Sequence, residues 1–502
     1  MIKNKEIVVV GAGIAGLTSA AILSKLGLSV TLIESHTQSG GCAGTFNRKG
    51  YIFDVGATQV AGLEAGGIHS RIFNFLEIPI PEATILDPSC IVDLNDGSEL
   101  INIWYEKNKW SNERSMQFPG SEKFWSLCES IHINNWKFAS QNSALPINNY
   151  WDFAQFIKAI NPKNILSGIL IKSSIFDLLK FCGCHLDERL IKFLNLQLKL
   201  YSQENVYNTA ALYGCTILQM PQKPHGLYHL NKSMQTLSNA LEESLRESKV
   251  NILFGEKVSA LNFDYKNKYW QVTTNKGGER FEYFALDVIY TPPPQSLLNH
   301  LDDSLDIYRK YKRRLKNLPK PSGAIVFYSA LQKAHMKNIS AYHYQFIDAE
   351  LGSLFVSLSA EGDGRAPNGE ITLIASIFAN TEKWFKLDSK QYSLKKRDYF
   401  EKISRALEDK FSIFPDKWLH RELATPLSFQ RWTNRPMGIV GGLGQNVDIF
   451  GIFGLSSRTP IKGLWLCGDS VYPGEGTAGV SQSALIVSRQ ILASKGIYNF
   501  NL

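Results

Sequence analysis

A run of glycines close to the start of the chain restricts the fold more than any other feature. Gly11, Gly13 and Gly16 stand between the apolar stretch EIVVV and the stretch LTSAAILSKLG, which SVTLIE follows. This order predicts a strand, a tight turn, a helix and a second strand. Gly11 permits the turn, Gly13 lets the backbone approach a pyrophosphate, and Gly16 lets helix and strand pack closely, while the helix N-terminus stabilises phosphate charge. We therefore expect a dinucleotide-binding βαβ unit.

An acidic residue closes the second strand of this unit. Glu34 lies 18 positions after Gly16, where a carboxylate can hold ribose hydroxyls and repels a 2′-phosphate. The fingerprint alone does not separate NAD from FAD, and a glycine-rich turn without a ligand is the alternative. Two further glycine-rich stretches, 39–46 and 53–67, predict loops where the backbone approaches a ligand.

Composition limits the partners and the compartment. The chain of 502 residues carries 54 basic and 46 acidic side chains, a net charge of +8, which is weak for a nucleic-acid binder but suits an anionic membrane surface. Its seven cysteines are scattered and odd in number, so we expect a reducing compartment rather than a disulfide framework. Residues 1–5 lead directly into an apolar strand, so we expect no targeting peptide. No apolar stretch reaches the roughly 18 residues of a spanning helix, so any membrane contact is expected to be peripheral.

The remaining patterns predict a second sheet and a helical part. Residues 120–220 are aromatic-rich and helical in pattern, and a helix over 164–181 with Lys172 and Lys180 is typical either of the membrane interface or of an ordinary buried helix. Residues 322–380 predict an antiparallel sheet. We further expect a helix in SMQTLSNALEESLRE, one strand in NILFGEKVSAL, a hairpin after it, and a strand, a glycine-rich turn and a helix in 463–492.

Several segments along the chain resemble the FAD-dependent phytoene desaturase and carotene isomerase family, within the wider flavin amine oxidoreductases. The segments are GAGIAGL, Glu34, SGGCAGTFNRKGYIFDVGAT, TPLSFQRWTNRPMGIVGGLGQ and LWLCGDSVYPGEGTAGVSQSA. Within the family, VGATQVAGLEAGGIHSRIF, QFPGSEKFW and LQLKLYSQENVYNTAALYG are most similar to the cyanobacterial carotenoid 3′,4′-desaturases. The chain departs from many relatives at Ala478 and Gly444, where proline is more usual.

The resemblance implies an α/β fold: a Rossmann-like FAD-binding domain of the glutathione-reductase type, an interleaved antiparallel-sheet substrate domain and a helical membrane-facing part. The implied FAD-binding domain spans 1–75, 226–300 and 455–502. The substrate-binding domain with its helical insertion spans 76–225 and 301–454.

The resemblance also implies which residues hold FAD. The implied cofactor-binding residues are Gly11, Ala12, Gly13, Ala15, Gly16, Glu34, Gly40, Gly41, Thr45, Val258, Gly468, Asp469, Gly476 and Val480. Gly40, Gly41 and Thr45 would line the pyrophosphate and ribityl path, and Val258 would contact adenine through its backbone. Gly468 and Asp469 would bind the ribityl-phosphate portion, and 476–480 would place a helix N-terminus near the isoalloxazine, where it favours negative charge on the reduced flavin.

The activity implied is that of a carotenoid desaturase, which inserts a double bond into an acyclic or monocyclic carotenoid and passes electrons to an acceptor such as a quinone or oxygen. Such a reaction needs few polar catalytic side chains, and we name none. Three alternatives remain: a carotenoid cis-trans isomerase using reduced FAD, a non-enzymatic prenyl-lipid carrier on the same fold, and a flavin monoamine oxidase. The expected location is peripheral, on the cytoplasmic side of a cell or thylakoid membrane.

Other candidate sites carry less weight. Cys182, Cys184 and His185 lack a second ligand pair at zinc-like spacing, so we expect no metal there. His225 and His229 are expected in a loop because Pro224 precedes them. The basic run 309–316 is either a solvated face or a contact for anionic lipid.

Overall fold

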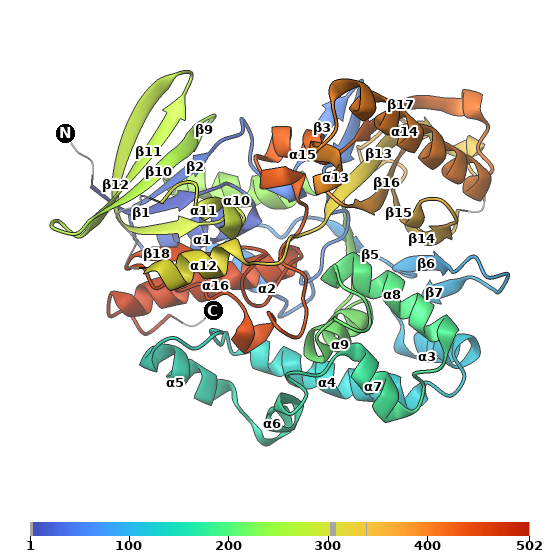
Figure 1. Cartoon of the computed structure of the whole chain (residues 1–502), viewed down its shortest axis with the longest axis horizontal. Helices are drawn as coiled ribbons and strands as arrows, with labels where there is room; N and C mark the ends of the chain where they lie inside the picture. Colours follow the sequence, from blue (N-terminus) through green and yellow to red (C-terminus); the bar gives the residue numbers. More distant parts are fainter. Residues whose placement is uncertain (1–3, 302–307, 338, 501) are drawn as a thin grey trace.

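The computed structural model of the chain describes residues 4–301, 308–337, 339–500 and 502. Two sheets lie at the two ends of the view in Figure 1, and a layer of helices runs below them. Residues 1–3, part of the segment for which no targeting peptide is predicted, lie outside the described residues.

The first sheet has seven strands in the order β10-β11-β12-β1-β2-β9, with β18 beside β12. β1 pairs in parallel with β2 and β12, as the βαβ unit requires, and β10, β11 and β12 form an antiparallel meander. All its strands fall within the stretches that the sequence assigns to the FAD-binding domain, whose bounds stay a prediction. The strands are β1 (Asn4–Val10), β2 (Val30–Glu34), β9 (Asn251–Phe254), β10 (Lys257–Asp264), β11 (Tyr269–Lys276), β12 (Glu279–Tyr290) and β18 (Leu464–Leu466).

The prediction of one strand in NILFGEKVSAL was wrong. The segment forms β9 and β10, which lie at opposite ends of the strand order. Gly255 between them has φ +70°, a left-handed conformation that ends β9 and turns the chain.

The second sheet also has seven strands, in the order β17-β13-β16-β15-β14-β6-β7. It is antiparallel, as predicted, except where β14 pairs in parallel with β6. Helix α14 (Ser389–Phe411) covers one face through Ile403, Leu407 and Phe411. The strands are β6 (Cys90–Asp93), β7 (Ile101–Ile103), β13 (Gly323–Gln332), β14 (His343–Asp348), β15 (Gly352–Leu358), β16 (Glu370–Ala379) and β17 (Trp418–Ala424).

Short elements connect these sheets. A small hairpin pairs β3 (Thr45–Arg48) with β4 (Tyr51–Asp54), and a short antiparallel ladder joins two distant segments, β5 (Ala83–Ile85) and β8 (Tyr228–Leu230). The remaining connecting helices are α11 (Pro294–Leu297), α12 (Arg309–Lys316), α13 (Glu382–Phe385) and α15 (Pro426–Thr433).

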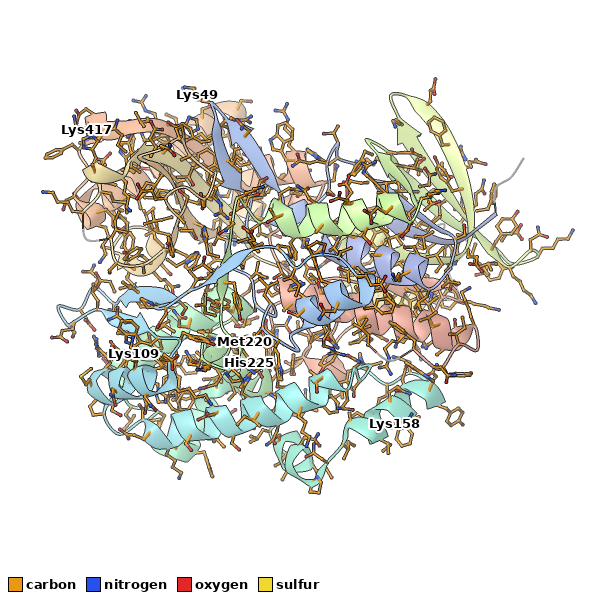
Figure 2. All side chains as sticks on the ribbon, turned by 180° about the vertical axis from the view of Figure 1, so that it is seen from behind. Lys49, Lys109, Lys158, Met220, His225 and Lys417 are labelled. Atoms are coloured by element: carbon orange, nitrogen blue, oxygen red, sulfur yellow. The ribbon has the colours of Figure 1, made fainter. Side chains whose placement is uncertain are left out.

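The helical layer is built from residues 107–219, close to the range predicted. Met220 and His225 lie together where this layer meets the strands above it (Figure 2). Among the described residues, the helices of this protein are all too short or too polar to cross a membrane. The layer comprises α3 (Lys107–Gln117), α4 (Glu122–Ser140), α5 (Tyr150–Ala159), α6 (Pro162–Gly168), α7 (Ile175–Cys182), α8 (Glu188–Ser202) and α9 (Ala211–Gln219).

The single helix expected over 164–181 was wrong. The segment forms the end of α6, a turn, and then α7. Ser174 and Asp177 form a capping box that starts α7 afresh, and Gly168 is a weak helix former where α6 ends. Lys172 lies in the turn and pairs with Asp448 at 3.0 Å.

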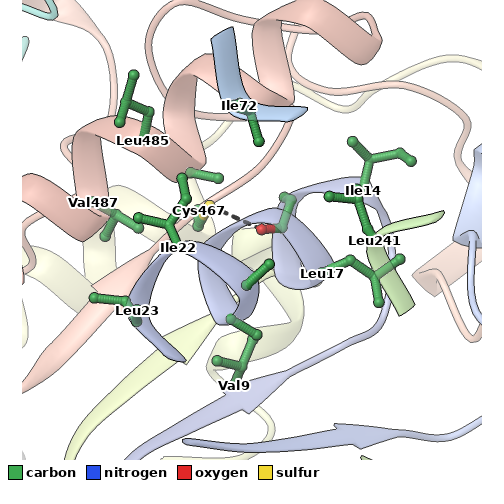
Figure 3. Packing of buried hydrophobic residues seen from close by; sticks show 14 of the residues in the cluster. Val9, Ile14, Leu17, Ile22, Leu23, Ile72, Leu241, Cys467, Leu485 and Val487 are labelled. Carbon is green, nitrogen blue, oxygen red and sulfur yellow. Dashed lines mark hydrogen bonds between the residues drawn. The ribbon is translucent and has the colours of Figure 1, made fainter. Parts of the chain in front are cut away.

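Helix α1 (Ile14–Lys25) is the centre of the first domain's core. Residues 14–23 are all buried, because α16 (Thr477–Ser494), α2 (Ile68–Leu76) and α10 (Gln235–Glu247) pack around α1. Figure 3 shows Leu17 and Ile22 of α1 between Leu485 and Leu241 of the neighbouring helices. This packing fixes the N-termini of α1 and α16, which both reach the site described next.

Candidate active site

The first glycine turn is shaped by close contacts on one side and open space on the other. Gly11 has φ +99°, and a Cβ there would lie 2.4 Å from Thr291 Oγ1. A Cβ on Gly16 would lie 1.9 Å from the carbonyl oxygen of Gly11. A Cβ on Gly13 would meet nothing within 4 Å. The backbone at Gly13 is therefore open to a ligand.

The second glycine loop lies directly against the first turn. Gly40 has φ +111°, donates its N–H to Ala12 O at 2.9 Å and forms a bridge with Gly13. Gly41 follows, also at positive φ. These two loops together make a cradle of backbone at the N-terminus of α1, which suits a pyrophosphate.

Glu34 ends β2 at the edge of this cradle. Its Oε2 accepts from Ala12 N at 2.7 Å, and its Oε1 accepts from His36 N at 2.7 Å. The Ser35 hydroxyl also donates to Oε1, at 3.1 Å. Three donors thus hold the carboxylate in place, and about one of its four lone-pair sites is left for a ribose hydroxyl.

Val258 lies on the edge strand β10 nearby. The register of its pairing with β11 shifts between Val258 and Ala260. The edge strand departs from regular pairing where the sequence predicts a backbone contact with adenine.

The second half of the site is the turn between β18 and α16. Gly468 has φ +125° and donates its N–H to Ser483 Oγ at 2.9 Å. Asp469 Oδ2 accepts from Arg435 Nη2 at 2.8 Å. Gly476 is the N-cap of α16, so the first turn of that helix faces the same space.

One cavity of about 1110 Å³ joins these pieces. It is somewhat larger than the roughly 300–1,000 Å³ of ordinary ligand pockets. It extends from the glycine cradle to the helical layer, where its wall is largely apolar. The wall residues from that layer include Trp136, Phe138, Leu145, Phe156, Ile160 and Ile165. This space can take a dinucleotide at one end and a long apolar molecule at the other.

Except for Ala12, Gly16 and Thr45, every residue that the sequence assigns to FAD lies on the wall of this cavity. Ala12 and Gly16 are in the turn and at the start of α1, behind the wall. Thr45 is in β3, where its N–H donates to Gln235 Oε1 at 3.2 Å. The contacts assigned to individual residues stay predictions.

Sequence reasoning missed an acidic residue in this cavity. Glu475 precedes the N-cap of α16, and its Oε2 accepts from Gln203 Nε2 at 2.6 Å and from Gly442 N at 2.9 Å. Burial raises the pKa of Glu475 to about 7, although these two hydrogen bonds lower it. The sequence shows Glu475 as the single carboxylate in the glycine-rich segment PGEGTAG. This segment was interpreted only as part of the flavin-binding motif, so no separate role was predicted for Glu475.

His225 and His229 take part in two other groups of polar side chains. His225 lies in a loop, as expected, and pairs with Glu64 at 3.0 Å. His229 lies instead in strand β8, because its backbone pairs with Thr84, and it contacts Asp363 at 2.9 Å. Within the described part of the chain, no group of three or more His, Cys, Asp or Glu side chains is placed to hold a metal ion.

Comparisons with known proteins agree with this geometry. The profile of the NAD(P)-binding Rossmann-like domain family matches residues 9–76. Prolycopene isomerase 1, chloroplastic, of an Oncidium hybrid cultivar is 24% identical over 98% of this chain and 84% of its own length. The 4,4′-diapolycopene oxygenase of a Methylomonas species is 22% identical over 98% of both chains. A solved structure of a putrescine oxidase variant has a TM-score of 0.64 at 15% identity, covering 98% of this chain and 99% of the other.

The backbone cradle, the carboxylate of Glu34 at its edge and the second glycine turn, together with these relatives, define the class of protein. The chain is an FAD-dependent oxidoreductase with a mixed α/β, Rossmann-like fold similar to that of the amine oxidases. Along nearly its full length the chain is similar to prolycopene isomerase and 4,4′-diapolycopene oxygenase, which supports a relation to the carotenoid desaturases and isomerases. The likeness to putrescine oxidase shows the shared fold alone.

Proposed function

We propose that this protein is a carotenoid desaturase, which introduces a double bond into an acyclic or monocyclic carotenoid. The observation that carries the proposal is the single cavity that runs from the residues assigned to FAD to an apolar limb in the helical layer. A long polyene bound there would lie beside the flavin in a space that excludes water. Relatives named prolycopene isomerase and 4,4′-diapolycopene oxygenase support a carotenoid as the substrate.

The protein itself positions the substrate relative to the cofactor and provides a pocket that excludes water. When bound, FAD supplies the chemistry by accepting a hydride from an unactivated carbon. The N-terminus of α16 favours the negative charge that develops on the reduced cofactor. Apolar walls hold the polyene without competing hydrogen bonds, and they keep water from the reacting carbons.

A carotenoid isomerase is the second candidate, because the prolycopene isomerases match along nearly the whole chain. An isomerase returns the electrons to its product, whereas a desaturase must pass two electrons to an external acceptor. Both reactions occur on the same fold, so the product of the reaction, rather than the fold, distinguishes them.

Product mass separates the two reactions. With an all-trans acyclic or monocyclic carotenoid, oxidised FAD and a quinone, we expect a product that has lost two hydrogens for each new double bond. Chromatography with mass spectrometry measures this loss. A product of unchanged mass and altered geometry, formed best with reduced FAD, would show instead that the protein is an isomerase.

We also propose that the protein attaches peripherally to the cytoplasmic side of a cell or thylakoid membrane, through helices α5 and α6. Tyr150, Phe153 and Ile157 share one face of α5 and are 93%, 51% and 51% exposed, and Ile165 and Ile169 are 57% and 77% exposed. An exposed apolar group of this size is typical of an interaction surface. The cavity wall also includes Ile165 and other residues of this region, so a water-insoluble substrate could enter there directly from lipid.

Replacing Phe153 and Ile157 together with serine should weaken binding to anionic liposomes at least about tenfold, because burying each such side chain contributes roughly 1.5–3 kcal/mol. The matched control replaces Leu394, which lies in α14, and Phe414, which lies shortly before β17; these side chains are 61% and 67% exposed. Sedimentation with vesicles measures both. Equal binding by the two double variants and the unchanged protein would refute the proposed surface.

A further inference from the structure

We propose that Glu475 is the proton acceptor of the desaturation, taking at Oε1 the proton lost from the carbon next to the one that gives up the hydride. The inference rests on the proposed function and adds a catalytic residue to it. It starts from the position of Glu475 on the cavity wall, one residue before the N-cap of α16.

The carboxylate is held by one oxygen and free at the other. Gln203 Nε2 and Gly442 N both donate to Oε2, at 2.6 and 2.9 Å. Among the described residues, no hydrogen-bond partner is found for Oε1. The bound oxygen fixes the orientation, and the free oxygen is available to a proton from the cavity.

Close packing keeps this orientation. Gly441 has φ +79°, and a Cβ there would lie 2.5 Å from both Gln203 Nε2 and Glu475 Oε2. Gln203 is held in turn, because its Oε1 accepts from Ser322 N at 2.9 Å and its Nε2 also donates to Gly442 O at 2.9 Å. A group positioned in this way loses little freedom when it reacts.

The surrounding charges leave the carboxyl able to change its protonation near neutral pH. Burial raises the pKa of Glu475 to about 7; Gln203, Gly442 and Arg435 lower it, and Asp469 raises it. A base whose pKa lies near the working pH is the most effective one. The titratable and charged groups that interact with it come from several elements and are Lys199, Tyr213, Arg435 and Asp469.

With bound FAD as the hydride acceptor and a quinone as the final electron acceptor, the step balances in atoms and electrons. One carbon–hydrogen bond would break with its electron pair, and bound FAD would supply the acceptor for this hydride. The neighbouring carbon–hydrogen bond breaks as its proton moves to Glu475 Oε1, and its electrons form the new double bond. The carboxyl then releases the proton to solvent, and a quinone-type acceptor takes the two electrons.

The test compares Glu475→Gln with Glu204→Gln, which removes a nearby carboxylate that is not on the cavity wall. In the FAD-loaded protein, desaturation should fall on the order of 100-fold or more in Glu475→Gln. Flavin absorbance and thermal unfolding should stay as in the unchanged protein, and Glu204→Gln should keep its rate. The unchanged protein should lose rate tenfold per pH unit below a pH of about 7, and Glu475→Asp should keep such a break at a lower rate.

A second readout needs no turnover. Infrared difference spectra of the FAD-loaded protein should show the C=O band of a neutral carboxyl that disappears as the pH rises through about 7, and Glu475→Gln should lack it. Gln203→Leu should move the midpoint upward, because it removes a hydrogen bond to the ionised form.

The outcomes separate this inference from the proposed function. If the unchanged protein desaturates its substrate and Glu475→Gln does so at the same rate with the same pH profile, the inference fails alone. Persistence of the titrating band in Glu475→Gln would also overturn it. If the unchanged protein produces no desaturated product with any quinone, the proposed function fails, and the proton transfer assigned here fails with it.

Discussion

Arg365→Ala should lower the free energy of unfolding by about 3–5 kcal/mol, because it leaves two buried carboxylates without their countercharge. Arg365 donates to Asp54 Oδ2 at 3.1 Å and to Asp363 Oδ2 at 2.6 Å, and all three side chains are at most 4% exposed. His229 also contacts this group. The cluster ties β4, β8 and the loop after β15 together, so its loss loosens the join between the two sheets.

Burial and the guanidinium of Arg365 shift the pKa of Asp54 in opposite directions. Burial raises the pKa of Asp54, and Arg365 lowers it. Without Arg365, the pKa of Asp54 should rise further, so the folded variant would bind a proton that the unfolded chain releases. The deficit in stability should therefore be smaller at acidic pH and larger at neutral pH.

Arg397→Ala is the matched control. Arg397 pairs with Glu401 at 2.8 Å, but its side chain is 79% exposed, so removing it should change the free energy of unfolding by less than about 1 kcal/mol. Urea unfolding followed by tryptophan fluorescence measures both variants. Similar values for the two would show that the buried cluster contributes no more than a surface ion pair.

Local patterns were sufficient to predict the elements on which the site is built. The unit β1–α1–β2 was predicted because its glycine spacing and its order of apolar segments are both contained within about thirty consecutive residues. The turn before α16 was predicted for the same reason. These are segments in which the local conformational preference and the final packing agree.

Contacts between distant segments could not be predicted in this way. Gln203 and Glu475 are separated by 272 positions, and Arg365 and Asp54 by 311. Neither pair produces a periodic pattern in the sequence, because each of these residues is an isolated polar residue within its own segment. The division of 251–261 into β9 and β10 was missed because an isolated glycine such as Gly255 is equally compatible with a bulge in one continuous strand, and the separation of the two halves is set by the strand order of the whole sheet.

Gly13→Ala should weaken FAD binding without disturbing the folded protein, whereas Gly16→Ala should disturb both. A Cβ on Gly13 meets no protein atom within 4 Å, and its φ of −72° is ordinary for alanine. The methyl group would instead occupy the space where the pyrophosphate is predicted to approach the backbone. Overpacking of this kind costs about 1–3 kcal/mol, which corresponds to a loss of FAD affinity of roughly 5- to 150-fold.

Gly16→Ala affects the same turn from the side that faces the protein interior. Its Cβ would lie 1.9 Å from Gly11 O, so the turn must move before the helix can pack. We expect the unfolding temperature of the flavin-free protein to fall in Gly16→Ala and to stay unchanged in Gly13→Ala. Thermal unfolding without FAD, followed by titration with FAD monitored through flavin fluorescence, measures the two effects separately. If Gly13→Ala bound FAD as tightly as the unchanged protein, the pyrophosphate would have to lie elsewhere in the cavity, and the assignment of the cradle to FAD would be wrong.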